Sequence, residues 1–207
     1  MKAEPLTKRT YAFFDGQNLF FAARDAFGYT YPNYDPLALA RAICQKQQWD
    51  LSEVRFYTGV PDATANARWH QFWTTKLGIM GTRGIHTFSR PLRYRHQGIV
   101  LPDGTESTVL VGQEKGVDVR IALDVVRLAR EGVFDVALVF SQDQDLSEVA
   151  DEVRHISNER DRWIKIASAF PFSVTSLNKR GINGTDWIKI DRATYDGCLD
   201  PRDYRPR

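Results

Sequence analysis

One stretch of the chain decides its fold: Phe134-Asp135-Val136-Ala137-Leu138-Val139-Phe140-Ser141-Gln142-Asp143-Gln144-Asp145. Its five apolar residues at 136–140 predict a strand that is buried on both faces of a parallel sheet. The run ends at a serine, and two acids follow before a helical pattern begins. Ligands of an open α/β sheet bind just beyond the carboxyl ends of its strands. We therefore expect chemistry at Asp143 and Asp145.

The rest of the chain alternates between strand and helix patterns. Helix boundaries are marked by Gly28 and by Asp35-Pro36, an N-cap followed by proline in the first turn. This alternation predicts an α/β fold with a central, mainly parallel sheet flanked by helices. The expected strands lie at 11–14, 54–59, 84–88, 136–140, 164–170 and 187–190, and the expected helices at 19–27, 36–48, 64–77, 115–131 and 146–159.

Composition describes an ordinary soluble globular protein, because 43% of the 207 residues are hydrophobic and 26% are charged. No repeat or linker interrupts the chain, so we expect a single domain over residues 1–207. Cys44 and Cys198 form neither a disulfide framework nor a zinc motif. No signal peptide and no apolar run of membrane-spanning length is present. These features predict a cytoplasmic protein without a membrane partner.

The segment 90–112 departs from the alternating rhythm. It combines Leu92-Arg93-Tyr94-Arg95 with a turn at Asp103-Gly104 and an apolar stretch at 107–111, which predicts a β-hairpin flap. No acid occurs between residues 82 and 102, although the net charge of the whole chain is only +2. We expect Arg90, Arg93 and Arg95 to contact a phosphate backbone, with Tyr94 available to stack. The alternative is an ordinary solvated hairpin.

Two acids outside the central stretch differ in their surroundings. Asp118 is the only acid on the apolar stripe of the expected helix 115–131. A charge on such a face is costly unless it is paired or binds a metal ion. Asp124 lies on the opposite face with Arg120 and Arg127, which predicts a solvated row of salt bridges.

The remaining acids follow the ends of strands. Asp15 closes the first strand, where capping the next helix is the alternative to a functional role. Asp145 begins a capping-box-like pattern that ends at Glu148, whereas Asp143 has no such structural explanation. Asp15, Asp118 and Asp143 are therefore expected to converge at one edge of the sheet. Converging carboxylates repel unless a cation bridges them, and oxygen-only ligands suit Mg²⁺ or Mn²⁺.

Four motifs, in this order, resemble the NYN domain of the PIN-like nuclease superfamily: Phe14-Asp15-Gly16-Gln17-Asn18, Tyr57-Thr58-Gly59, Lys115-Gly116-Val117-Asp118-Val119 and Ser141-Gln142-Asp143-Gln144-Asp145-Leu146. The resemblance spans roughly residues 11–190. It implies a Rossmann-like PIN/NYN fold and metal-dependent hydrolysis of phosphodiester bonds, usually in RNA. The flap is not clearly part of the motif set, so its expected role depends on composition alone.

The resemblance also implies roles for particular residues. Asp15, Asp118 and Asp143 would bind metal and act in catalysis, with Asp145 as a helper. Asn18 would orient Asp15 or contact the substrate. Further candidates are less specific: Lys115, and more weakly Lys179 and Arg180, for nucleic acid, and Asp124 and Ser141 as secondary site residues.

The sequence thus predicts a metal-dependent endoribonuclease, with DNA as the alternative substrate. A catalytically inactive nuclease-like module that binds RNA or a protein is the alternative function. A phosphatase of the haloacid dehalogenase type is disfavoured, because Gln17 stands where a second aspartate is expected. A Toprim-type domain fits Asp143 and Asp145, but its first strand would end in a glutamate rather than Asp15. No residue pattern predicts an oligomeric state.

Overall fold

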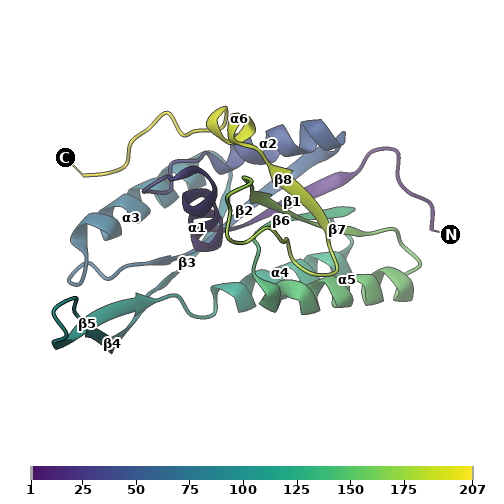
Figure 1. The fold of residues 1–207 in the computed structure, drawn as a ribbon. Coiled ribbons are helices and arrows are strands. Elements are labelled where there is room, and N and C mark those ends of the chain that lie inside the picture. The colour runs from purple at the N-terminus through teal and green to yellow at the C-terminus, as the bar shows by residue number, and fades with distance from the viewer. Residues whose placement is uncertain (1, 207) are drawn as a thin grey trace.

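The structure, a computed structural model, describes residues 2–206 and is built around one sheet of six parallel strands (Figure 1). The strand order is β3-β2-β1-β6-β7-β8, so the sheet has β1 and β6 at its centre. The α/β fold expected from the sequence is confirmed. The strands are β1 Arg9–Asp15, β2 Asp50–Val60, β3 His86–Pro91, β6 Val136–Phe140, β7 Lys165–Pro171 and β8 Asp186–Ile190.

Helices cover both faces of the sheet, and each face has its own hydrophobic core. One core contains apolar residues from four helices, and the other contains apolar residues from α4 and α5. Both faces of the central strands are therefore shielded from water, which explains why β6 is an uninterrupted apolar run. The helices of the first core are α1 Gly16–Phe27, α2 Pro36–Gln47, α3 Ala67–Thr82 and α6 Arg192–Asp196, and those of the second are α4 Val117–Glu131 and α5 Ser147–Glu159.

Local signals explain most helix boundaries. The Asp35 side chain accepts hydrogen bonds from the backbone of Leu37 and Ala38, as the Asp35-Pro36 pair predicted. The expected helix 64–77 is displaced to residues 67–82, because the Asn66 side chain rather than an earlier residue caps its first turn. Within residues 2–206, no helix is both long and apolar enough to cross a membrane.

The register of the central strands determines where the functional edge lies. Phe14 of β1 is paired with Phe56 of β2 on one side and with Phe140 of β6 on the other. The rings of Phe14 and Phe140 stack with their centroids 3.9 Å apart. The residues that follow these phenylalanines, Asp15 and Ser141, therefore emerge side by side at the carboxyl edge.

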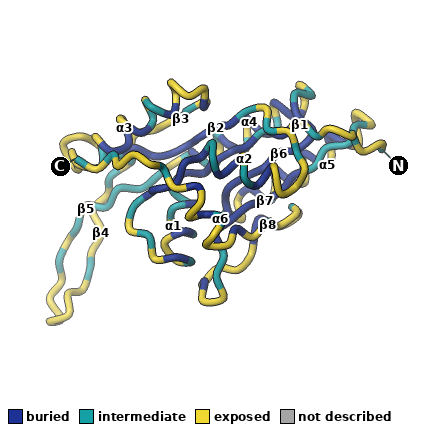
Figure 2. The backbone as a smooth tube through the Cα atoms, turned by 90° about the horizontal axis from the view of Figure 1, so that it is seen from above, coloured by how far each residue is buried: buried dark blue, intermediate teal, exposed yellow. Residues whose placement is uncertain are grey.

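The expected flap is a separate antiparallel hairpin, with β4 at Arg93–Val100 and β5 at Glu106–Gln113. It projects from the body of the protein as a largely exposed arm (Figure 2). Its base is held by a backbone hydrogen bond from Leu92 to Val60 and by the Tyr94 hydroxyl, which accepts from the Asp62 N–H at 3.0 Å. Tyr94 is half-buried there and contributes to anchoring the arm.

Asp124 corrects one expectation from the sequence. Its pairs with Arg120 and Arg127 form as predicted, and these arginines are 39% and 50% exposed, but the Asp124 side chain is only 2% exposed. The reason is β2, which lies against this face of α4. The Tyr57 hydroxyl donates a hydrogen bond of 2.9 Å to the Asp124 carboxylate, and Arg55 forms a salt bridge of 3.7 Å with the same group. Asp124 therefore ties α4 to the sheet.

We expect Asp124→Ala to lower the free energy of unfolding by about 2–4 kcal/mol, because it deprives buried Tyr57 and Arg55 of a shared carboxylate. Urea denaturation measures the loss. Glu131→Ala is the matched control: this acid also pairs with Arg127 but is 45% exposed, and its loss should stay below about 1 kcal/mol. Equal losses in the two variants would contradict the anchoring role.

Candidate active site

Four carboxylates line one pocket of about 350 Å³ at the carboxyl edge of the sheet: Asp15, Glu114, Asp118 and Asp143. Asp15 ends β1, Asp118 lies in the first turn of α4, and Asp143 follows β6. The structure thus brings together the three acids that the sequence singled out. Lys115, Gly116 and Val119 complete the lining.

Asp15 is buried, with 4% of its surface exposed, and both of its oxygens are engaged. Oδ1 accepts from the Asn18 N–H at 3.1 Å, so Asp15 is the N-cap of α1. Oδ2 accepts from the Ser141 hydroxyl at 3.3 Å. Burial raises the pKa of the Asp15 carboxyl to about 6, opposed by the Asn18 hydrogen bond and assisted by the negative charge of Asp143. Capping and pocket lining are combined in one residue.

The capping role that was expected for Asp145 belongs to Asp143. Asp143 caps a short 3₁₀ turn at Gln144–Leu146, and its Oδ1 accepts from the Asp145 N–H at 3.0 Å. Asp145 makes no capping bond, because the helix begins through that turn and α5 has Leu146 at its N-cap. Asp143 still lines the pocket, whereas Asp145 is exposed and is not part of the lining. The predicted capping box is wrong.

Glu114 is the acid that the sequence analysis missed. It lies between the hairpin and α4, and its Oε2 accepts a hydrogen bond from the Gly59 N–H at the end of β2. A Cβ atom at residue 59 would lie only 2.8 Å from that oxygen, so a larger residue here would displace the Glu114 carboxyl. Burial, followed by the charge of Asp15, raises the pKa of the Glu114 carboxyl to about 8. Only its position one residue before the Lys115-Gly116 motif pointed to it.

The donor chemistry of the pocket fits Mg²⁺ or Mn²⁺. All donors are oxygens, and within residues 2–206 none of the four carboxylates forms a salt bridge. Burial raises the pKa values of Asp15 and Glu114 and so disfavours their charged forms, and a bound cation would favour those forms again. In the same part of the chain, no three His, Cys, Asp or Glu side chains stand close enough together to hold an ion. Binding would therefore require water molecules to complete the coordination of the ion or the acids to move inward.

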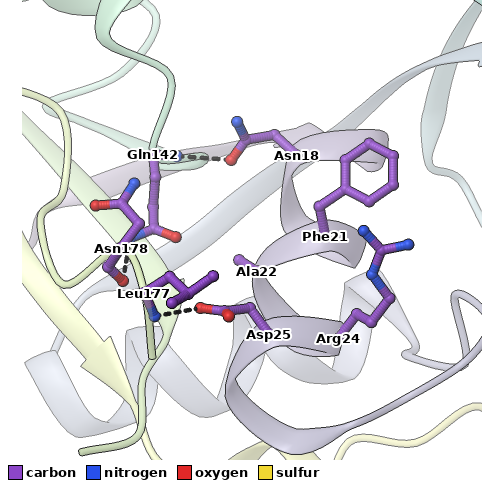
Figure 3. Close-up of a pocket in the computed structure, with 8 residues that line it drawn as sticks. All are labelled: Asn18, Phe21, Ala22, Arg24, Asp25, Gln142, Leu177 and Asn178. Carbon is purple, nitrogen blue, oxygen red and sulfur yellow. Dashed lines mark hydrogen bonds between the residues drawn. The ribbon is translucent and has the colours of Figure 1, made fainter. Parts of the chain in front are cut away.

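Asn18 connects the pocket to its surroundings. Its backbone holds Asp15, and its Oδ1 accepts from the Gln142 N–H at 2.8 Å. The same side chain lines a second, larger pocket of about 560 Å³ between α1 and the segment around Leu177 (Figure 3). The contact of Asn18 with Asp15 is thus made by its backbone, whereas its side chain lines the larger pocket.

The basic candidates divide into two groups. Lys115 lines the acidic pocket, and Arg90 lies beside it, since a Cβ atom at Gly116 would be 2.7 Å from the Arg90 guanidinium. That guanidinium also lies over the Phe88 ring, 5.5 Å from its centroid. Arg93 and Arg95 are exposed on β4 of the projecting hairpin.

The two weaker basic candidates lie on the other side of the edge. Lys179 and Arg180 are exposed in the loop between β7 and β8. This loop forms part of the wall of the larger pocket through Leu177 and Asn178.

Comparison with known proteins agrees with this geometry. The model of the NYN domain family matches residues 9–159. The chain therefore belongs to the NYN domain family, within the PIN-like nuclease superfamily. A search of curated proteins finds no significant match.

Solved structures contribute information on the fold alone. A protein of unknown function from Vibrio parahaemolyticus matches 93% of this chain and 96% of its own, with a TM-score of 0.54 and 17% sequence identity. Ribokinase from Giardia lamblia gives a TM-score of 0.33 at 10% identity, covering 60% of this chain and 36% of its own. The second likeness is too remote to support any argument.

The raised pKa of Glu114 predicts how metal-free stability depends on pH. The folded-state pKa of about 8 lies above the ordinary value of 4.5, so folding favours the protonated form and stability is lost as pH rises toward 8. Between pH 5 and pH 8 in EDTA, the free energy of unfolding of the wild-type protein should fall by about 2–3 kcal/mol more than that of Glu114→Gln. Urea denaturation at the two pH values measures this difference.

Glu106→Gln is the control for this experiment, because Glu106 is an exposed acid on the hairpin. Its pH dependence should match that of the wild-type protein. A Glu114→Gln profile that also matched the wild type would show that the Glu114 carboxyl is not held protonated by burial.

Proposed function

We propose that the chain is a divalent-metal-dependent nuclease that hydrolyses phosphodiester bonds in RNA as an endoribonuclease. The observation that carries the proposal is the pocket of four carboxylates, none of them in a salt bridge within the described chain, at the carboxyl edge of an NYN fold. Basic side chains beside it supply charges that attract a phosphate backbone. The fold supports the nuclease class, and the pocket supports the chemistry.

Asp15, Asp118 and Asp143 would hold Mg²⁺ or Mn²⁺. A bound ion of this kind supplies an activated water molecule and stabilises the negative charge that develops on the leaving oxygen. Asn18 and Ser141 donate to the two oxygens of Asp15 and so orient this carboxylate at the end of β1. Glu114 is held by Gly59 on the opposite wall and adds a fourth oxygen donor.

Phosphate binding would involve Lys115 and Arg90 next to the pocket, with Arg93 and Arg95 further out along the hairpin. Contacts to phosphates position a nucleic acid without reading its sequence. This part of the proposal therefore applies to any strand that reaches the pocket.

A second candidate function is a nuclease-like module that binds RNA without cutting it. The observation that favours it is the spacing of the acids: within residues 2–206, no three of them stand close enough together to hold an ion. The two candidates differ in whether added metal draws the acids together, which makes them separable by experiment.

Titration with Mg²⁺ and Mn²⁺ should raise the melting temperature and activate cleavage of a labelled RNA. Asp143→Asn should lose about 100-fold or more in cleavage rate, because an acid that holds the ion is replaced by a neutral amide. It should also lose most of the metal-induced rise in melting temperature. Asp151→Asn is the matched control, because Asp151 is an exposed acid on α5 paired with Arg154.

The same assay with DNA of equal sequence tests the choice of substrate. Cleavage by Asp143→Asn at the wild-type rate would overturn the metal-site assignment. RNA binding with neither metal-induced stabilisation nor cleavage would favour the binding module.

A further inference from the structure

The larger pocket beside the acids has a built wall on each side (Figure 3). One side is a single face of α1, formed by Asn18, Phe21, Ala22 and Asp25, whose spacing places them together on a helix. The other side is formed by Gln142, Leu177 and Asn178. Its volume of about 560 Å³ is within the range of about 300–1,000 Å³ that is typical of ligand sites. We call this pocket the α1 groove.

Phe21 is the unusual residue of the α1 groove. Leu19 and Phe27 of α1 are buried in the core, and Phe20 is half-buried, but Phe21 is 46% exposed. The ring centroids of Phe20 and Phe21 lie 5.5 Å apart, so Phe20 supports the Phe21 ring from one side. The Arg24 guanidinium lies 4.9 Å from the centroid of its ring. An exposed aromatic ring beside a cation is the combination that stacks on a nucleobase and binds its phosphate.

The opposite wall is held in place by hydrogen bonds. The Asp25 carboxylate accepts from the Leu177 N–H at 2.8 Å. The Gln142 side-chain amide donates to the Arg180 carbonyl at 2.8 Å, and the Gln144 amide donates to the Gly181 carbonyl at 3.0 Å. The loop that carries Leu177 is thus fastened to α1 and to the segment after β6. A ligand would enter a groove that is already formed.

The linings of the α1 groove and of the acidic pocket adjoin each other at two points. Asn18 lines the groove, while its backbone N–H holds Asp15 in the acidic pocket. Gln142 lines the groove, while the next residue, Asp143, lines the acidic pocket. A strand with a phosphate at the acids therefore has an adjacent nucleotide within reach of the groove.

We propose that the α1 groove binds one unpaired nucleobase of the strand whose backbone reaches the acidic pocket, with Phe21 stacking on the base and Arg24 contacting a phosphate. Leu177 forms the apolar wall facing the base. Asn18 has its Oδ1 occupied by Gln142, which leaves its Nδ2 group to donate to the edge of the base. This proposal rests on the proposed function and narrows its substrate to a strand that is unpaired next to the cleaved bond.

A base must leave a duplex to stack on a protein ring, so the proposal separates single from double strands. Fluorescence anisotropy in EDTA measures binding of a labelled single-stranded RNA without cleavage. Phe21→Ala should weaken this binding by about 5- to 100-fold, as expected for the loss of one stacked base. Phe21→Trp should retain it. Binding to the RNA duplex should be weaker and should not change with Phe21→Ala.

Two controls account for general effects of substitution. Leu6→Ala removes a fully exposed apolar side chain that lies before β1, at the opposite edge of the sheet. This change should leave binding unchanged. Arg24→Ala should weaken binding and reduce its salt dependence by about one charge. Arg160→Ala, an exposed arginine at the end of α5, should do neither. Melting temperatures of the variants verify that each one folds.

An abasic scan locates the stacked base. One abasic position should weaken wild-type binding by the same factor as Phe21→Ala and should have no further effect in that variant, because both changes remove one contact. If the abasic position weakens binding of single-stranded DNA by the same factor, the contact is to the base alone. If the loss of binding is confined to RNA, the protein also contacts the 2′-hydroxyl. Both results support the groove.

The outcomes separate this inference from the proposed function. Metal-dependent cleavage would support the proposed nuclease function. If RNA binding were then unaffected by Phe21→Ala, or equal for single and double strands, the proposal that the α1 groove binds a base would be wrong. Loss of RNA binding in Phe21→Ala, with no cleavage under any metal, would support base binding in the α1 groove and contradict the proposed nuclease function. No binding of single-stranded nucleic acid by the wild-type chain would overturn the groove.

Discussion

The burial of the Asp15 carboxylate is the constraint on which the functional edge depends. Asp15 ends the central strand β1, and its carboxylate caps α1 and accepts a hydrogen bond from Ser141 after β6. One side chain therefore connects three elements. The cost appears in its pKa, which rises from 3.8 to about 6 and corresponds to about 3 kcal/mol of disfavoured charge. Such a cost is tolerated where the charge has a use, and oxygen ligands gathered at a strand end suit a cation.

The hairpin is more than an exposed arm. It is inserted between β3 and α4, and its last strand delivers Glu114 to the acidic pocket, where Gly59 at the end of β2 holds it. The arm and the wall of the pocket are thus one continuous segment. A nucleic acid bound along the basic strand β4 would follow that segment toward the acids, which explains how charge far from the pocket can guide a substrate.

The acidic pocket and the α1 groove are positioned by the same elements, α1 and the end of β6. α1 begins at the capping residue Asp15, so the helix that is positioned by the acid also presents Phe21 and Arg24 at a constant distance from it. The loop opposite is fastened by the Gln142 and Gln144 side chains, which follow directly on β6. Under the two proposals, chemistry and recognition would share the ends of the two central strands, and a groove that is already formed would limit the entropy lost on binding.

The sequence by itself determined the alternation of strands and helices, the hairpin, and the convergence of Asp15, Asp118 and Asp143. Local periodicity suffices for the strands, the helices and the hairpin, because these depend on residues close together in the chain. The convergence of the three acids, which are far apart in the chain, follows from the rule that sites form beyond the carboxyl ends of parallel strands. Tertiary structure alone decided that Asp124 is buried, that Asp143 rather than Asp145 makes the cap, that Glu114 joins the acids, and that Phe21 lines a groove. The Asp143 cap forms within a local turn, through the Asp145 N–H. The other three features depend on partners brought from distant strands or loops, since the burial of a side chain is determined by what packs against it.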